Sequence, residues 1–531
     1  LALAAAAPVG AQTPDRLPDV TPIRADALTK ALRQGEIGLP RYALERATSL
    51  FHLGAVRARY GAVQRPDPRS ATLILRDLSL RLNELSPADE ERARRLLARP
   101  TDGVADPGKN GYTVPEATPR CRPDFCIHYV PNTEDAPPRR DANDDGVPDW
   151  VMKVRSVVRN VWSSETGALR YREPLSDSSS PNDGGDGRLD IYLANLGDDR
   201  IYGYCTTDDP NADNPIPTTF AVSAYCVIDD DFREPIFSDQ TPLGNTKVTV
   251  AHEFFHAVQA AYDWKEDLWL FEGTAAWIED EVYDAINDNR QYLARSPLTA
   301  SFVPLDLGAQ GFQYGSWIYF RRLSERFGPR IVRSIWNRAD ASASGPDDYS
   351  AQAISRALSG RGTTFRAAFN DFSRVNRRAR IVYDEGAAYP ARPAALRTWT
   401  LTGARRTRSG APALYQLGAE TVVFKPGRGI GGNAKLRITL NLPSKPRGSE
   451  AAVLRFRPAG KLIKSSRINL NGAGNETLRV GFGRGEVGRV ELVLVNASTR
   501  YRCGLGLPGT TCQGLPRDDR RAYRFTARAI G

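Results

Sequence analysis

The sequence predicts an α+β protein with a helical N-terminal segment, a mixed middle region and an all-β C-terminal region. Apolar residues recur at three- and four-residue spacing over residues 20–100, which is typical of amphipathic helices. Short strand-like runs alternate with loops rich in Asp, Gly, Pro and Asn over residues 115–245, and helical patterns follow to about residue 380. After Pro390 the segments alternate in polarity, so we expect a β-sandwich accessory domain over residues 391–531.

Length and composition limit the class of protein. A chain of 531 residues and 58.4 kDa exceeds one ordinary core and predicts two or three domains. Hydrophobic residues make up 41% and charged residues 25%, and the mean hydropathy is −0.43. These values exclude disorder throughout and a polytopic membrane protein, and no stretch reaches the roughly 18 to 20 apolar residues of a membrane span.

The net charge of +10 is unevenly distributed. Residues 121–300 hold 33 Asp and Glu against 15 Lys and Arg, whereas residues 391–531 hold 26 Lys and Arg against 7 Asp and Glu. The acidic middle favours cation sites. The basic β-domain either binds an anionic surface or ligand or is simply a solvated Arg-rich surface. It lacks the combined aromatic and basic patterning of nucleic-acid readers, so we expect no nucleic-acid partner.

The first eleven residues, LALAAAAPVGA, are similar to the end of a secretory signal peptide. Residues 9–11 have the small character that a signal peptidase requires at its cleavage site. We therefore interpret residues 1–11 as a signal-peptide remnant and expect a secreted protein, either extracellular or periplasmic.

The cysteines support export, because disulfides persist in oxidising compartments. Their proximity in the sequence predicts three local disulfides. An alternative is that Cys121 or Cys126 is a free thiolate that caps a metal ion in a latent form. The close couples are Cys121 and Cys126, Cys205 and Cys226, and Cys503 and Cys512.

Residues 12–114 are predicted to form the helical N-terminal segment. The sequence Ser86-Pro87-Ala88-Asp89 supplies an N-cap before its last helix. On a secreted protein such a segment is either a removable propeptide or a packing subdomain, and both interpretations stay open.

The strongest functional signal is the sequence HEFFH, which spans His252 to His256. Residues i and i+4 share one face of a helix, so the two imidazoles can converge on one metal ion. Glu253 lies beside them and is placed as the catalytic general base that takes a proton from an attacking water. Zinc bound in this way needs a third protein ligand.

No histidine follows His256, so the third ligand belongs to another residue type. Glu272 is the best candidate, because a short loop would let a second helix with the sequence FEGTAAWIED fold back onto the metal. Glu279 lies two turns further along the same face, and we expect it to support the site rather than bind the metal. The sequence therefore predicts a Zn²⁺ site formed by His252, His256 and Glu272.

At these motifs the chain resembles a known group of enzymes. HEFFHAVQ followed by FEGTAAWIEDEVY is similar to the gluzincin branch of zinc metallopeptidases, in which a Glu of an EG-containing helix completes the site. More closely, DDGVPDW, GRLDIYL, YGY and YGSWIYFRRLSERFG resemble an uncharacterised family of secreted bacterial metalloproteases over residues 115–340. The resemblance implies a zincin-like metallopeptidase domain, which we assign to residues 115–390, and an endopeptidase with a protein or peptide substrate. It also implies a mixed sheet whose edge strand, near Ala221 to Ile228, aligns the substrate.

The group that stabilises the oxyanion is less evident. Tyr314, in the sequence FQYGSW, opens the next predicted helix, where related enzymes often place a tyrosine. We take Tyr314 as the candidate second catalytic residue, and a core tyrosine is the alternative.

The sequence DANDDGVPD contains a second metal-binding pattern. Oxygen donors at Asp141, Asn143, Asp145 and Asp149, with a glycine at position 6, match the first part of an EF-hand-like loop. Position 12 is Met152, so the bidentate acid of such a loop is missing. The two interpretations are an incomplete Ca²⁺ loop and an Asx-rich turn that caps the following helix.

The two remaining histidines, His52 and His128, are interpreted as structural residues of a helix and a strand. Taken together, the patterns predict a secreted, monomeric zinc metallopeptidase. Its β-domain is the candidate to bind an unidentified surface or ligand. One alternative is a calcium-stabilised surface-binding protein with a catalytically silent zincin domain. Another is a zinc hydrolase that acts on a non-peptide amide or ester.

Overall fold

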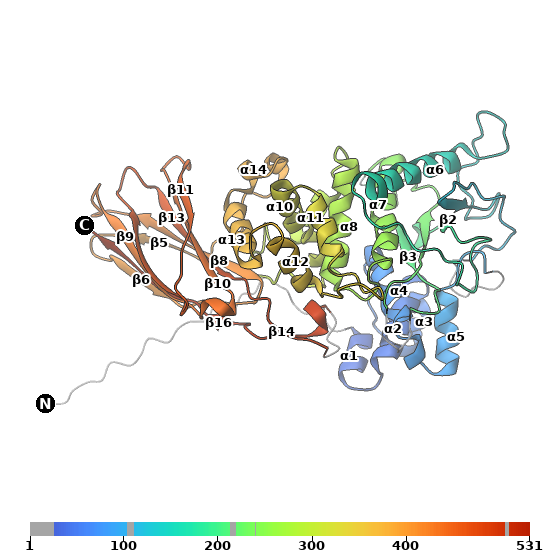
Figure 1. Ribbon diagram of the computed structural model, residues 1–531, viewed down its shortest axis with the longest axis horizontal. Coiled ribbons are helices and arrows are strands. Elements are labelled where there is room, and N and C mark those ends of the chain that lie inside the picture. Colours follow the sequence, from blue (N-terminus) through green and yellow to red (C-terminus); the bar gives the residue numbers. More distant parts are fainter. Residues whose placement is uncertain (1–25, 103–110, 213–218, 239, 505–508) are drawn as a thin grey trace.

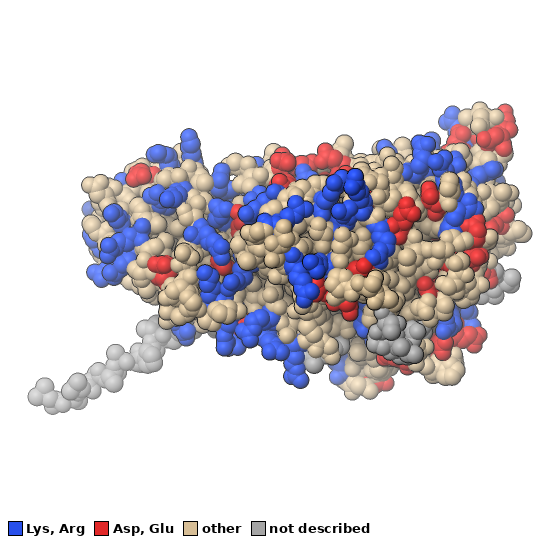
Figure 2. All heavy atoms as spheres, in the orientation of Figure 1, with Lys and Arg blue, Asp and Glu red and all other residues tan. Residues whose placement is uncertain are grey.

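The computed structural model describes residues 26–531 except 103–110, 213–218, 239 and 505–508, so the signal-peptide remnant predicted at residues 1–11 lies outside the described part. The architecture is α+β, as expected. Helices and a small sheet form one end of an elongated molecule, and β-strands form the other (Figure 1). Figure 2 shows Lys and Arg side chains gathered over the β end, whereas Asp and Glu side chains are more frequent over the helical end. No helix in the described ranges has both the length and the apolar character of a membrane span.

Helices α1 to α5 precede the sheet. Local signals set their ends: the Ser86 hydroxyl accepts a hydrogen bond from the Asp89 amide at the start of α5, and Pro87 occupies the first turn. Leu75 of α4 packs with Tyr204 and Val227 of the sheet, so these helices cover one face of it. The bounds are α1 Ala27–Arg33, α2 Leu39–Phe51, α3 Leu53–Tyr60, α4 Ala71–Ser79 and α5 Pro87–Leu96.

The small sheet lies between two cores. Its strand order is β1–β2–β4–β3, with β1, β2 and β4 parallel and β3 antiparallel to β4. Successive side chains alternate between the faces, so Tyr204 and Val227 join the core under α4 whereas Cys205 and Ile228 join the core under α6 and α7. The bounds are β1 Phe125–His128, β2 Leu189–Ala194, β3 Gly203–Thr206 and β4 Tyr225–Asp229.

The edge strand is β3, and the edge implied near Ala221 to Ile228 is wrong. β4 is paired on both sides, to β2 in parallel and to β3 in antiparallel register. Among the described residues β3 has only β4 as a neighbouring strand, so its other side forms the edge of the sheet.

All six cysteines form the local disulfides that proximity predicts. Cys121 is bonded to Cys126, so the alternative of a free thiolate at either position is wrong. Cys205 and Cys226 stand directly opposite each other on β3 and β4, and their disulfide ties the edge strand to the sheet. The third disulfide joins Cys503 and Cys512.

Helices dominate from the end of the sheet to residue 382, and most of them share one large core with the sheet. Figure 1 places α7 and α8 near the middle of the molecule, between the sheet and the C-terminal strands. The bounds are α6 Asp149–Trp162, α7 Pro242–Ala260, α8 Leu268–Tyr283, α9 Phe312–Gly315, α10 Trp317–Phe327, α11 Arg330–Trp336, α12 Ser350–Ser359, α13 Phe365–Val375 and α14 Ala379–Val382.

Two sheets enclose a separate core in the C-terminal region. One has the order β11–β10–β13–β8–β5, and the other has the order β12–β9–β17–β6. The outer face of the first sheet is also buried, because Phe369 and Phe372 of α13 share a core with Leu454 and Val493. The bounds are β5 Arg397–Leu401, β6 Thr407–Gly410, β8 Gly418–Pro426, β9 Lys435–Asn441, β10 Ser449–Phe456, β11 Leu462–Arg467, β12 Asn475–Gly481, β13 Arg489–Asn496 and β17 Arg524–Ile530.

A buried ion pair joins the helices to this sheet. Arg377, just after α13, donates from Nε to Glu491 of β13 at 2.7 Å and from Nη1 to the Pro393 carbonyl at 2.5 Å. Replacing Arg377 by Ala leaves Glu491 Oε2 and the Pro393 carbonyl without this partner, while Glu491 Oε1 keeps its ion pair with Arg489, and we expect a loss of about 1.5–3 kcal/mol in the free energy of unfolding. Denaturant unfolding followed by tryptophan fluorescence measures this change. The control Arg378→Ala alters a neighbouring arginine without an ion pair and should change stability by less than about 1 kcal/mol.

Candidate metal centre and active site

Helix α7 places the two histidines of the HEFFH motif on one face. The helix begins where the Thr241 hydroxyl accepts a hydrogen bond from the Gly244 amide, with Pro242 in the first turn. His252 and His256 are both buried, and their ring centroids lie 4.7 Å apart. The spacing of four residues therefore brings the imidazoles together, as predicted from the sequence.

Helix α8 brings the predicted third ligand to these imidazoles. Glu272 Oε2 lies 3.1 Å from His252 Nε2 and 3.8 Å from His256 Nε2. Close packing explains why a glycine follows Glu272: a Cβ at Gly273 would lie 2.3 Å from the Ser316 hydroxyl oxygen. A larger residue would push α8 away from the start of α10 and move Glu272 with it.

The three side chains have the chemistry of a divalent-metal site such as that of zinc. One donor atom from each of His252, His256 and Glu272 lies within 4.8 Å of the other two. His256 Nε2 and Glu272 Oε1 are buried without a hydrogen-bond partner, which is costly unless another group binds them. Burial and the neighbouring His252 hold the pKa of His256 well below its usual range, so its imidazole is neutral and able to bind a metal. These residues therefore fit zinc.

Two further side chains orient the imidazoles. His252 Nδ1 lies 2.7 Å from Glu279 Oε1, which agrees with the supporting role expected for Glu279. His256 Nδ1 lies 2.7 Å from Gln259 Oε1. The amide nitrogen of Gln259 donates to the Phe271 carbonyl, so its oxygen faces His256 and fixes Nδ1 as the protonated nitrogen. His256 Nε2 is thereby left for a metal. His252 Nε2 is instead hydrogen-bonded to Glu272 Oε2, and against the effect of burial the hydrogen bonds of Glu272 and Glu279 raise the pKa of His252, so a metal bound here would replace a proton on Nε2.

Glu253, the predicted general base, is buried beside the candidate metal ligands. Burial raises the pKa of Glu253 to about 7, against the opposing effects of His252 and of a hydrogen bond from Thr72. The Thr72 hydroxyl lies 2.9 Å from Glu253 Oε2. The roles of Thr72 and Gln259 were not predicted from the sequence, and only the position of Gln259, three residues after His256, offered a signal.

Tyr314, the candidate second catalytic residue, lies in the short helix α9 and beside His252. Its ring centroid is 6.3 Å from that of His252, and it lines the same cavity as His252 and Glu253. Its hydroxyl donates to the Arg69 carbonyl oxygen at 2.7 Å. The position fits an oxyanion donor, but the hydroxyl is engaged by the N-terminal segment, so this role stays a prediction.

The cavity over the catalytic residues is small, about 40 Å³. This volume holds few water molecules and no extended peptide, and Arg69 of the N-terminal segment lines it. Its walls come from α7, α8, the edge strand and the loop after α8. The lining residues are Arg69, Tyr202, Gly203, Val248, Thr249, His252, Glu253, Glu279, Asp288, Tyr292 and Tyr314.

The predicted calcium loop precedes α6, far from this cavity in sequence. Asp141 Oδ2 accepts from the Gly146 amide at 2.8 Å, and Asp145 Oδ1 accepts from the Val147 amide at 2.9 Å. Gly146 has a φ of +78°, which explains the glycine at this turn. Asn143 and Asp149 make comparable bonds within the turn. These contacts suit an Asx-rich turn, and calcium binding stays a prediction.

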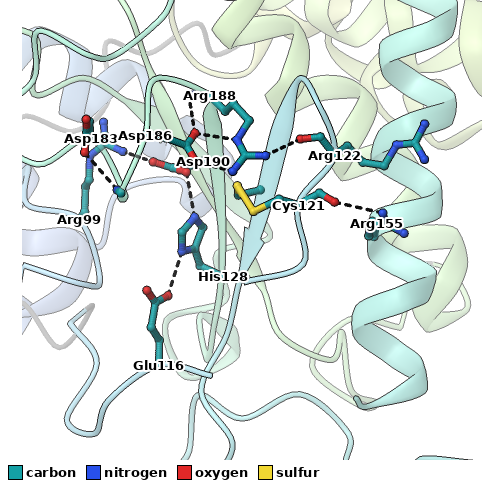
Figure 3. The surroundings of a disulfide bond; sticks show 12 residues. Arg99, Glu116, Cys121, Arg122, His128, Arg155, Asp183, Asp186, Arg188 and Asp190 are labelled. Carbon is teal, nitrogen blue, oxygen red and sulfur yellow. Dashed lines mark hydrogen bonds and ion pairs between the residues drawn. A yellow bond between two sulfur atoms is a disulfide. The ribbon is translucent and has the colours of Figure 1, made fainter. Parts of the chain in front are cut away.

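His128 belongs to a buried polar network, as Figure 3 shows. It lies on β1 with Nε2 at 2.8 Å from Asp190 and Nδ1 at 2.9 Å from Glu116. Arg99 of the N-terminal segment binds Asp190 from the other side at 2.5 Å. Cys126 also lies within ligand distance of His128 and Asp190, but its sulfur is in a disulfide. The network is therefore structural, in agreement with the interpretation of His128 from the sequence.

The chain matches no known protein-family model, and no curated protein sequence matches it. The geometry of His252, Glu253, His256 and Glu272 therefore carries the functional argument.

Gln259 offers a test of the metal centre. Changing Gln259 to Leu removes the acceptor that orients His256, and we expect the affinity for zinc to fall by about 10- to 100-fold. Competition with a chromogenic chelator measures this affinity without any assay of activity. The control Gln352→Leu, on α12, should bind zinc as the unchanged protein does. Equal affinity in both variants would contradict the role of Gln259.

The His128 network predicts a pH dependence of stability. Burial alone would lower the pKa of His128, but the hydrogen bonds and charges of Asp190 and Glu116 raise it from 6.5 to about 9. A raised pKa means that the network stabilises the fold fully below about pH 6.5 and loses this contribution as the pH rises through 9. We expect the difference in free energy of unfolding between the protein and its His128→Phe variant to shrink by up to about 3 kcal/mol over this range. Denaturant unfolding at a series of pH values measures it, and a constant difference would refute the assignment.

Proposed function

We propose that this protein is a zinc-dependent peptidase of the gluzincin type. The observation that carries the proposal is the buried cluster of two imidazoles and one carboxylate in which His256 Nε2 and Glu272 Oε1 have no hydrogen-bond partner among the described residues. Glu253 follows the first imidazole in the same helix and faces the same cavity. This combination of three metal ligands and an adjacent carboxylate is the arrangement that metal-assisted hydrolysis requires.

The residues divide the chemistry among themselves. When bound by His252, His256 and Glu272, zinc supplies a Lewis acid that makes a water more acidic and polarises a carbonyl. Glu253 accepts the proton of the attacking water at its carboxylate and returns it to the leaving amine nitrogen. Tyr314 is the candidate to donate its hydroxyl hydrogen to the developing oxyanion. Burial excludes bulk water and strengthens each of these interactions.

The location that fits this activity is outside the cytoplasm. Three disulfides form among the six cysteines, and disulfides of this kind persist in oxidising compartments. We therefore propose a secreted or periplasmic enzyme with protein or peptide substrates.

A substitution at Glu253 tests metal binding and turnover separately. We expect Glu253→Gln to keep about one zinc per chain, because the metal ligands are unchanged, and to lower turnover of a quenched peptide by about 10²- to 10⁴-fold. Elemental analysis and the rate of peptide cleavage measure the two properties on the same sample. Full activity in this variant would contradict the proposed role of Glu253 as the general base.

The matched control acts on a ligand instead of the base. His256→Ala should lose zinc as well as activity, and added zinc should not restore the rate. A chelator should abolish cleavage by the unchanged protein, and zinc should restore it. Unchanged zinc content in His256→Ala would contradict the ligand assignment.

A further inference from the structure

A short stretch of the N-terminal segment occupies the catalytic cavity. We call it the plug and define it as residues 69–72, the end of a 3₁₀ turn at Pro68–Ser70 and the start of α4. Packing of α4 on the sheet uses Ala71, Leu75 and Leu78, of which only Ala71 belongs to the plug. Arg69 and Thr72 therefore make contacts that the covering of the sheet does not require.

The Thr72 side chain is hydrogen-bonded to two groups that an extended peptide substrate would need, the Cys205 amide and the Glu253 carboxylate. Its Oγ accepts a hydrogen bond from the Cys205 amide at 3.0 Å, so it occupies an outward backbone donor of the edge strand β3. The same hydroxyl donates to Glu253 Oε2 at 2.9 Å. A peptide that added a strand to this edge would need the Cys205 amide free. One side chain thus blocks both the edge strand and the general base.

The side chain of Arg69 fills a pocket built for a cation. Its Nη1 donates to the Tyr292 hydroxyl at 2.7 Å and lies 3.8 Å from Asp288 Oδ2. The guanidinium carbon lies 4.8 Å from the ring centroid of Tyr202 and 5.4 Å from that of Tyr292. Two aromatic rings and a carboxylate recognise a guanidinium by cation–π contact and charge. Tyr202, Tyr292 and Asp288 line the same cavity as Glu253.

The backbone of Arg69 also takes the place of a substrate group. Its carbonyl oxygen accepts the hydroxyl of Tyr314, which is the candidate oxyanion donor. The Arg69 side chain therefore occupies a specificity pocket, and the Arg69 carbonyl engages the candidate oxyanion donor. The Thr72 hydroxyl engages the general base.

We propose that the plug binds as a pseudosubstrate, which keeps the intact chain latent, and that the pocket of Tyr202, Asp288 and Tyr292 selects peptides with an arginine or lysine side chain. This inference rests on the proposed peptidase function. Neighbouring contacts hold the plug in place: buried Arg76 donates to the Glu266 carbonyl at 2.9 Å, and Trp264 donates to the Ser79 hydroxyl at 2.9 Å. The closed state is therefore the resting state of the full chain.

Substitutions in the plug test latency in the full-length, zinc-loaded protein. Arg69→Ala combined with Thr72→Val removes the guanidinium and the hydroxyl and should raise cleavage of an Arg-containing quenched peptide at least about tenfold, because a closed fraction above nine tenths lowers apparent affinity by that factor. Arg65→Ala is the matched control, since Arg65 lies on the same segment but pairs with Asp199 at the surface. Adding Glu253→Gln to the double variant should abolish the increased cleavage, which controls for cleavage by a contaminating protease. Circular dichroism checks folding, and Arg69→Gln serves as a milder second variant.

Binding of argininamide tests the pocket without any activity. Calorimetry should detect binding of argininamide to Arg69→Ala but not to the unchanged protein, whose pocket is filled. Adding Asp288→Asn should weaken this binding at least about tenfold, because the carboxylate that pairs with the guanidinium charge is lost. Asp284→Asn, at an exposed carboxylate nearby in sequence, should leave it unchanged. In the activated double variant, replacing the Arg of the peptide by Ala should lower kcat/KM by a similar factor.

The outcomes separate this inference from the proposed function. If the unchanged chain is fully active, is inhibited by a chelator and shows no preference for Arg, the plug proposal is wrong and the proposed peptidase function is still supported. A lower rate in Thr72→Val than in the unchanged chain also overturns the plug proposal, because Thr72 would then only position Glu253. Argininamide binding with about one zinc per chain but no cleavage by any variant supports the pocket and overturns the peptidase.

Discussion

The burial of Glu272 between two imidazoles is the constraint on which the rest of the structure depends. A carboxylate and two histidines placed in an apolar core are stable only if each polar atom has a partner or a metal. Helices α7 and α8 supply that arrangement, and each imidazole has its second nitrogen bound by a side chain of the same two helices, Gln259 or Glu279. The small sheet and the helices around it then exclude water from this cluster.

The sheet connects the candidate metal centre to the edge strand β3, where we propose that a substrate binds. β3 is antiparallel to its neighbour and stands at the edge, and the disulfide between Cys205 and Cys226 fastens it to β4. Gly203 of this strand packs closely on α7, since a Cβ there would lie 3.2 Å from Glu253 Cγ. The edge strand and the general base are therefore positioned against each other, and any chain that binds one of them meets the other.

Local patterns were enough to predict the parts of the site that lie within one helix or between neighbouring helices. The spacing of His252 and His256 follows from helix geometry, and Glu272 is separated from them only by a short loop. Proximity in the sequence also identified the disulfides. The order of strands could not be predicted in this way, because nothing local distinguishes β3 from β4 as the edge. Thr72 contacts Glu253 across 181 residues of sequence, and such a contact depends on how α4 packs on the sheet.

The order of these elements along the chain has a consequence during synthesis. A ribosome releases the N-terminus first, so Arg69 and Thr72 exist before any of the three candidate metal ligands or Glu253 has been made. When α7 and α8 finally fold onto the sheet, they close over a segment that is already present. In the proposed latent form, a host cell that makes and exports this protein would at no stage contain the finished catalytic site without its cover.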